Sequence, residues 1–298
     1  MIHRFAVGDL PCAVISDGQP EPPWEPALET FFTPGTGVPP EELRAAVAAE
    51  GRGRTTVRCG YNCLCVETPA GLTVIDTGLG RDFGGYGPEV APLVGRFGER
   101  LAEAGFSAAD AVAVVFTHLH EDHVRGAMWP GEPAFPRATL YAHAAEVAFW
   151  SGAPPSVPPD QREPALEAIR VFGERLRPVE YGVEIMPQVR AVEAAGHTPG
   201  HMAVLLESRG QRLLCTGDSF HDPLQLGHPT WRTPGTPTPS GRYAAAAHCW
   251  SGRRRRTSSY WPTTCRSPAW AGSPGTATPS PGGRSLPDPC LIPARPGP

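Results

Sequence analysis

The 298-residue sequence contains no lysine, so all 26 of its basic residues are arginine. Lysine codons are rich in A and most arginine codons are rich in G and C, which indicates a GC-rich gene. The 30 acidic residues leave a formal net charge of −4. A slightly acidic chain gives no reason to expect a nucleic-acid partner.

Long apolar runs are also missing. No stretch approaches the roughly 20 apolar residues that a membrane-spanning helix needs. The first residues, MIHRFAVGDLPC, lack the basic-then-apolar pattern of a secretory signal. We therefore expect a cytoplasmic protein without a membrane partner.

The eight cysteines lack the paired spacing of a zinc ribbon. The stretch CGYNCLC (59–65) predicts buried thiols on a strand rather than a metal site. No GxSxG sequence is present, so the chain offers no nucleophile elbow for serine catalysis.

Residues 1–232 alternate strand-like and helix-like segments, which predicts a mixed α/β layered domain. Apolar or β-branched runs that end at Gly, Pro or Asp predict strands at 12–17, 61–67, 72–76, 111–116, 189–194, 202–207 and 212–216. Capping and composition signals predict helices at 39–51, 89–105 and 161–177.

The composition changes near residue 233. Residues 233–298 contain thirteen prolines, eight arginines and a single acid, Asp288. No stretch keeps a helical or strand period, so we expect a disordered tail after a domain that spans residues 1–232.

The densest group of candidate ligands is FTHLHEDHVRG (116–126), directly after the apolar run AVAVVF. It contains His118, His120, Asp122 and His123, a spacing that one face of a helix cannot present but a loop leaving a strand can. Imidazole and carboxylate ligands suit Zn²⁺, and also Fe or Mn, better than Ca²⁺ or Mg²⁺. This loop therefore predicts a transition-metal site.

Two later stretches supply further candidates. AAGHTPGHM (194–202) places His197 just after a predicted strand, and LLCTGDSFHDP (213–223) places Asp218 at the end of another. Loops at one edge of a sheet can bring such residues together. His201 and His221 lie close to these motifs, and we expect them to be structural or to line the cleft.

Taken together, THLHEDH, GHTPGH, TGDSF and the strand TVIDTGLG (73–80) resemble the metallo-β-lactamase superfamily over roughly residues 1–232. Within it, SDG (16–18) and GDSFHDPLQ most resemble the branch with N-acyl-homoserine lactonases and methyl parathion hydrolase. The resemblance implies an αββα sandwich with a two-metal site at one edge of the paired sheets.

The resemblance also implies a role for each residue. The first metal would be held by His118, His120 and His197, and the second by Asp122 and His123. Asp218 would bridge both metals, and Asp76 would orient a ligating histidine. Two Zn²⁺ ions per chain are implied, with Mn or Fe as alternatives.

The implied chemistry is hydrolysis of a lactone, an ester or a similar small substrate. Two cations about 3.5–4 Å apart share a water and lower its pKa toward about 7, so that a bridging hydroxide can attack. Asp122 and Asp218 would be the catalytic carboxylates, and Asp122 would steer or accept a proton.

Three other functions are considered. An iron-dependent oxidoreductase of the flavodiiron type is disfavoured because that pattern has Glu where this chain has His120. A nuclease of the RNase Z type is disfavoured because residues 1–232 are acidic.

A catalytically impaired protein with an incomplete second metal site stays open, since the family carries one more histidine ligand downstream of the bridging Asp. The later histidines His221, His228 and His248 do not fit that position.

The tail suggests an explanation for the missing histidine. Residues from about 234 onward have the composition of GC-rich DNA translated out of frame. When the codons of YWPTTCRSPAWAGS (260–273) are regrouped by one base, they permit L-A-Y-H-L-P-F-P-G-L-G-R-V. In the superfamily, the missing ligand is a His before such an apolar stretch. We therefore predict a frameshifted C-terminal part, with Thr264 in place of that histidine and the last elements of the fold lost.

Overall fold

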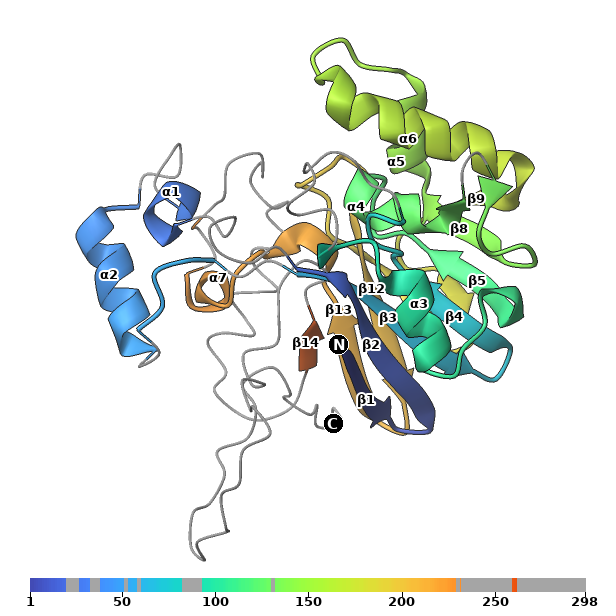
Figure 1. The fold of residues 1–298 in the computed structure, drawn as a ribbon, viewed down its shortest axis with the longest axis horizontal. Helices are drawn as coiled ribbons and strands as arrows, with labels where there is room; N and C mark the ends of the chain where they lie inside the picture. Colours follow the sequence, from blue (N-terminus) through green and yellow to red (C-terminus); the bar gives the residue numbers. More distant parts are fainter. Residues whose placement is uncertain are drawn as a thin grey trace, which may run out of the picture.

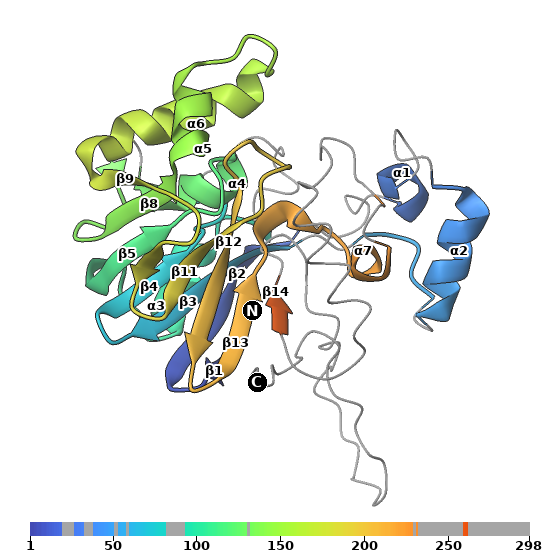
Figure 2. The same cartoon turned by 180° about the vertical axis from the view of Figure 1, so that it is seen from behind.

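The computed structural model describes residues 1–19, 27–32, 38–50, 53–57, 60–81, 93–129, 132–228, 231 and 259–261. Most strands in these ranges form two sheets that pack face to face (Figures 1 and 2). The first sheet has the order β1-β2-β3-β4-β5-β8-β9. Its strands are β1 (Ile2–Val7), β2 (Leu10–Gly18), β3 (Tyr61–Thr68), β4 (Gly71–Ile75), β5 (Ala111–Val115), β8 (Thr139–His143) and β9 (Leu176–Val179).

The second sheet has the order β10-β11-β12-β13-β14. Its strands are β10 (Glu184–Met186), β11 (Val189–Glu193), β12 (Met202–Ser208), β13 (Gln211–Cys215) and β14 (Ser259–Trp261). A small separate hairpin pairs β6 (Met128–Trp129) with β7 (Glu132–Pro133). The seven strands predicted from the sequence are all present, and none of their ends differs from the prediction by more than two residues.

Strands β2 and β3 are buried on both faces, which explains their nearly unbroken apolar sequence. On β2, Cys12 and Val14 pack toward the second sheet in one core, together with residues such as Val204 and Leu213. Ala13 and Ile15 alternate with them and belong to the core under the helices. Because side chains alternate across a strand, β2 contributes to both cores. The prediction of buried thiols is confirmed for Cys63 and Cys65 on β3, which are free and buried, and Cys59 lies outside the described residues.

Helices cover the outer face of the first sheet. These are α3 (Phe97–Glu103), α5 (Ala144–Ser151) and α6 (Pro159–Phe172), and large side chains such as Phe97, Trp150 and Phe172 fill the layer between them and the strands. In the described part of the chain, no helix lies over the outer face of the second sheet (Figure 2). The αββ part of the predicted αββα sandwich is therefore present.

Two predicted helices are shorter in the structure. Of the helix predicted at 89–105, residues 89–92 lie outside the described residues, and α3 runs from Phe97 to Glu103. Just before it, the backbone N–H groups of Gly95 and Phe97 donate to the buried carboxylate of Asp17 on β2. The helix predicted at 161–177 runs from Pro159 to Phe172 and ends at Gly173, whose φ of +50° leaves the helical region. In contrast, the helix predicted at 39–51 is α2 (Pro40–Ala49).

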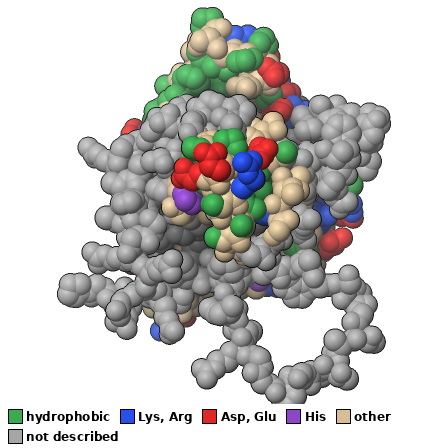
Figure 3. Space-filling view, turned by 90° about the vertical axis from the view of Figure 1, so that its left-hand side faces the viewer, with side chains coloured by type: hydrophobic (Ala, Val, Ile, Leu, Met, Phe, Trp, Pro, Cys, Tyr) green, Lys and Arg blue, Asp and Glu red, His purple; other side chains and the backbone are tan. Residues whose placement is uncertain are grey.

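A small helical unit lies beside the sandwich. It consists of α1 (Leu28–Phe32) and α2, which pack against α7 (Leu224–Gly227) through an apolar cluster that includes Phe32, Leu43 and Trp231. Figure 3 looks onto this side of the molecule, where acidic, basic and apolar side chains lie intermixed. Residues between β2 and β3 thus pack against residues that follow β13.

The predicted tail lies almost entirely outside the described residues. Its described part is β14, which pairs in parallel with β13, although the sequence showed no strand period there. The domain boundary near residue 232 and the frameshifted origin of the tail stay predictions. No helix in the described residues is long and apolar enough to cross a membrane.

Candidate metal centre

Four candidate ligands lie on the loop that follows β5, as the sequence predicted. His118 and His120 come before a short helix, α4 (Glu121–Val124), which carries Asp122 and His123. Phe116 precedes these residues, Leu119 lies between His118 and His120, and both apolar side chains are fully buried in the core under the helices. The apolar positions fix the loop and leave the polar ones to converge at the edge of the sheet.

The other two candidates come from the second sheet. His197 lies in the loop after β11, and Asp218 follows β13 in a single turn of 3-10 helix. Strands β11 and β13 are both antiparallel to β12, so their carboxyl ends meet at one edge. At this edge a hydrogen bond connects the two sheets: the backbone N–H of Met202, at the start of β12, donates to the backbone carbonyl of Thr117, just after β5.

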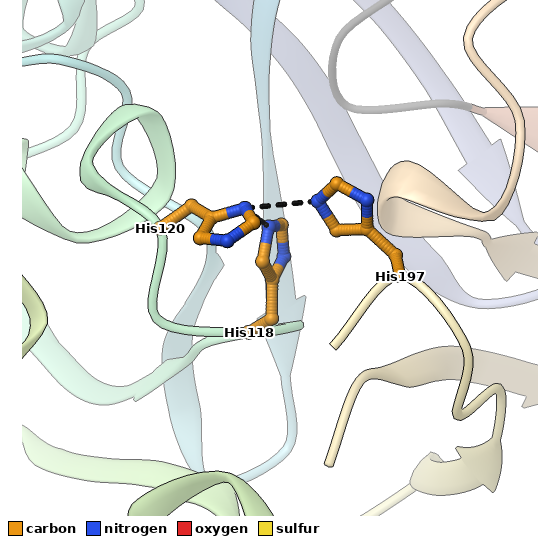
Figure 4. A group of neighbouring side chains, drawn as sticks. All are labelled: His118, His120 and His197. Carbon is orange, nitrogen blue, oxygen red and sulfur yellow. Dashed lines mark hydrogen bonds between the residues drawn. The ribbon is translucent and has the colours of Figure 1, made fainter. Parts of the chain in front are cut away.

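Three histidines form the first group of ligand atoms (Figure 4). The Nδ1 atom of His120 lies 2.9 Å from Nε2 of His118 and 2.9 Å from Nε2 of His197. A single ring nitrogen carries one hydrogen or one lone pair, so His120 cannot form both contacts as good hydrogen bonds. Three converging nitrogens are instead the arrangement that a shared cation would satisfy.

A second group of converging ligand atoms contains His118, His123 and Asp218, and the carboxylate of Asp122 lies beside it without joining it. The Nε2 atom of His123 lies 3.4 Å from Oδ2 of Asp122 and 3.3 Å from Oδ1 of Asp218. This nitrogen is buried and has no hydrogen-bond partner among the described residues. The other oxygen of Asp218, Oδ2, lies 3.5 Å from Nε2 of His197. One carboxylate thus faces both groups, as a bridging ligand must.

Asp76 occupies the position expected for an orienting acid. It follows β4, and its Oδ2 accepts a hydrogen bond at 2.9 Å from Nδ1 of His123. The same carboxylate accepts bonds from the backbone N–H and the hydroxyl of Thr117. With its Nδ1 held by Asp76, His123 turns its Nε2 toward Asp122 and Asp218. Burial lowers the pKa of His123, but Asp122, Asp218 and Asp76 outweigh it and raise that pKa well above its usual range, so a metal at Nε2 would have to displace a proton.

Burial sets the charge state of the first group. Burial, and then the neighbouring histidines, hold the pKa of His118 well below its usual range, and burial does the same for His197. Both rings are therefore neutral near pH 7, with lone pairs available to a metal. Burial raises the pKa of Asp218, but His123 and His221 outweigh it and hold that pKa well below its usual range. The residues present therefore fit a cationic metal centre.

The two histidines that the sequence analysis set aside have different positions. His201 is structural, as expected: its Nδ1 donates to the carbonyl of Ala194, and its Nε2 accepts the backbone N–H of Asp218. His221 lies at the centre itself, with Nε2 3.3 Å from Oδ2 of Asp218, and belongs to a third ligand group with His197 and Asp218. Its place three residues after Asp218 was the available signal.

Sequence reasoning missed two residues on α5. Glu146 is fully buried and accepts hydrogen bonds from both histidine loops, and the ring of Trp150 packs edge-on against His120 with centroids 5.6 Å apart. The stretch that contains them, HAAEVAFW, carries no motif. Only the packing of α5 against the loops reveals their relation to the centre.

Comparison with known proteins places this geometry among related folds. The family model for the metallo-beta-lactamase superfamily matches residues 56–246. No curated protein matches the chain by sequence. Among solved structures, AidC, a dizinc quorum-quenching lactonase in complex with its product, superposes with a TM-score of 0.72 at 22% identity, covering 90% of this chain and 91% of that one.

Two further structures extend the likeness. The hydrolase AbOPH of the beta-lactamase superfamily gives a TM-score of 0.70 at 20% identity, over 89% of this chain and 90% of its own. The Bacillus thuringiensis protein AiiA, as a mutant with N-decanoyl-L-homoserine bound at its active site, gives 0.53 at 17% identity, over 82% and 86%. At these identities the likeness shows a shared fold.

Proposed function

Because the chain belongs to the metallo-beta-lactamase superfamily, we propose that it is a metal-dependent hydrolase of a lactone, an ester or a similar small substrate. The observation that carries the proposal is the position of Asp218. Its two carboxylate oxygens lie between the first and second ligand groups, 3.5 Å from His197 and 3.3 Å from His123. This is the arrangement that two-metal hydrolysis requires.

The proposed ligand sets follow the three converging loops. His118, His120 and His197 hold the first metal, Asp122 and His123 hold the second, and Asp218 contributes to both. Zinc is the proposed metal, since imidazole and carboxylate ligands suit it and the similar AidC is a dizinc enzyme. When bound, the metals supply Lewis acidity and make water a nucleophile near neutral pH.

The chain's own residues prepare and assist that chemistry. Asp76 holds the ring of His123 in one orientation, so that its Nε2 faces the second metal position. Asp122 keeps a side chain that is 21% exposed, unlike the buried Asp218. A carboxylate that reaches both solvent and the centre can take up the proton released when water attacks. We therefore assign Asp122 to proton transfer and Asp218 to bridging.

The substrate class rests on the structural neighbours. Both AidC and AiiA are described with N-acyl-homoserine products or ligands bound. A lactone or ester carbonyl is also the group that a paired-metal centre without a serine nucleophile attacks directly. The proposed partner is therefore a small molecule, and the proposed location is the cytoplasm.

A catalytically impaired protein is the second candidate. In the described residues, the ligand groups end at His221, and no later histidine joins the second group. His228 stacks on Trp231 with ring centroids 3.9 Å apart instead, and His248 and Thr264 lie outside the described residues. If the tail is frameshifted, the second metal is bound by Asp122, His123 and Asp218 alone and turnover is low.

Metal analysis and an activity panel separate the two candidates. Purified protein is analysed for Zn, Mn and Fe and assayed on lactones, aryl esters and phosphotriesters. Two metals per chain with hydrolysis of a lactone or ester support the hydrolase, and one metal with turnover near background supports the impaired form. Hydrolysis that is unaffected by complete metal removal would contradict both.

The gene itself tests the frameshift. Sequencing the locus should show that a one-base shift near the codon for residue 234 gives an open frame that encodes a histidine at the Thr263–Thr264 junction. Protein expressed from the corrected gene should bind the second metal more tightly than this chain. An early stop codon in the shifted frame would contradict the prediction.

A further inference from the structure

Glu146 links the two loops that carry the first group of histidines. Its side chain is completely buried. Oε1 accepts hydrogen bonds from the backbone N–H of Leu119 at 3.0 Å and from the indole N–H of Trp150 at 2.7 Å. Oε2 accepts from the hydroxyl of Thr198 at 2.6 Å and from the backbone N–H of Gly200 at 3.0 Å.

The donors come from the backbone that presents the ligands. Leu119 lies between His118 and His120, and Thr198 follows His197 directly. A single carboxylate therefore fixes the loop after β5 to the loop after β11. Bonds to an ionised acceptor are about twice as strong as neutral ones, so the bonds from Leu119, Thr198 and Gly200 to Glu146 connect the two loops more strongly than bonds to a neutral acceptor would.

The surrounding packing leaves little room for a different arrangement. A Cβ atom on Gly200 would lie 2.1 Å from the backbone nitrogen of Glu146, so the loop can approach α5 this closely only with glycine there. On the other side, Trp150 is buried between α5 and His120. The carboxylate, the glycine and the indole together hold the three imidazoles at their contact distances.

The charge of Glu146 is also relevant. All four donors that the described residues supply to it are neutral groups, so no arginine balances the buried carboxylate. A buried anion is costly even when it is hydrogen-bonded, and a cation held by His118, His120 and His197 would offset that cost. Metal binding and the buried carboxylate should therefore favour one another.

We propose that Glu146 is a positioning residue that preorganises His118, His120 and His197 and thereby raises the affinity of the first metal site. This inference rests on the metal ligands assigned in the proposed function. Residues that orient metal ligands typically change metal affinity by 10–100-fold when they are replaced. Glu146 acts on three ligands through two loops at once.

The test compares zinc binding by the full chain and by Glu146→Gln. Glutamine has nearly the same shape, but an NH2 group replaces one of the two carboxylate oxygens. That NH2 group can only donate, and it would face two N–H or O–H donors that have lost their acceptor. After metal removal, the apparent zinc Kd is measured by competition with a chromogenic chelator. We expect about a 10–100-fold weaker Kd for the tighter site, and an altered Co²⁺ absorption spectrum. Glu163→Gln, at an exposed position of α6, is the matched control and should match the wild type.

A second variant covers the case in which Glu146→Gln does not fold. Thr198→Val removes one donor and keeps the carboxylate, and should weaken zinc binding by about tenfold, at the low end of such effects. A zinc Kd within twofold of wild type, in folded Glu146→Gln or in Thr198→Val, would overturn the inference. Wild-type protein that binds no zinc would overturn it as well. Wild-type protein that binds zinc but hydrolyses nothing would contradict only the proposed function.

Discussion

The carboxylate of Asp76 and the ring of His123 are in direct contact, with Oδ2 2.9 Å from Nδ1. Both side chains are 1% exposed, and they come from loops after neighbouring parallel strands, β4 and β5. The contact fixes the orientation of the His123 ring, so that Nδ1 faces Asp76 and Nε2 faces Asp122 and Asp218. Orientation of this kind is what makes a histidine ready to bind a metal before the metal arrives.

The first prediction concerns the three-histidine group. Replacing both His118 and His120 with Ala removes two of the three converging nitrogens. Metal content, measured by plasma emission spectroscopy, should fall by one ion per chain, and hydrolysis should be lost. The same metal stoichiometry in this double variant would rule out the assigned first site. Replacing the half-buried His3, which is remote in sequence from every candidate ligand, serves as the control.

The second prediction concerns Asp218. Because its two oxygens face different ligand groups, Asp218→Ala should lower metal content at both sites and hydrolysis together. We expect a loss of at least about 100-fold in kcat/KM, which corresponds to roughly 3 kcal/mol of transition-state stabilisation. Metal titration and kinetics on the same sample provide the measurement. Full activity in the variant would remove the bridging role.

A third prediction addresses the helical unit beside the sandwich. Arg54 forms ion pairs at 2.5 Å with Asp222, in the loop after Asp218, and at 2.7 Å with Glu50, at the end of α2. The side chain of Asp222 is only 2% exposed, so Arg54→Met would leave a buried carboxylate without its cation. We expect the free energy of unfolding to fall by about 2 kcal/mol, less than for a fully buried pair because Arg54 is partly exposed.

Urea denaturation checks this value against a matched arginine. Arg44→Met breaks an exposed pair with Glu29 and should cost less than about 0.5 kcal/mol. In the double variant Arg54→Met with Asp222→Asn, part of the lost stability should return. If Arg54→Met and Arg44→Met lowered the free energy of unfolding equally, the ion pairs of Arg54 would not stabilise the helical unit more than an exposed pair does.

The fourth prediction is a pH dependence of stability in metal-free protein. Burial lowers the pKa of His201 from its usual 6.5 to about 4. Between these values the unfolded chain binds a proton that the folded chain does not, so stability is full above pH 6.5 and is lost as the pH falls toward 4. The contribution of this one group is on the order of 3 kcal/mol.

The variant His201→Gln isolates that contribution. Its amide oxygen can accept the backbone N–H of Asp218, as Nε2 of His201 does, but it does not titrate. Urea midpoints measured between pH 7 and pH 4.5 should fall less steeply for the variant than for the wild type. Parallel pH profiles would show that His201 titrates normally in the folded protein.

The sequence by itself was enough to identify the family and to predict the main strands along the chain and the six candidate ligands. His118, His120, Asp122 and His123 are close in the chain, and Gly-flanked His197 and Asp218 follow recognisable strands, so local pattern was sufficient to find them. Helix ends were less predictable. The start of α3 depends on Asp17, which lies 80 residues away from Phe97 and caps its backbone.

Only the tertiary structure decided which other side chains serve the centre. No motif in the sequence marks Glu146, and its relation to the centre emerges because α5 packs against two loops whose donors, Leu119 and Thr198, are 27 and 52 residues away in the sequence. The position of His221 beside Asp218, and the bond from Arg54 to Asp222, have the same origin. Contacts between distant segments form when apolar faces are buried together, and a single sequence does not record which polar groups that burial brings into reach.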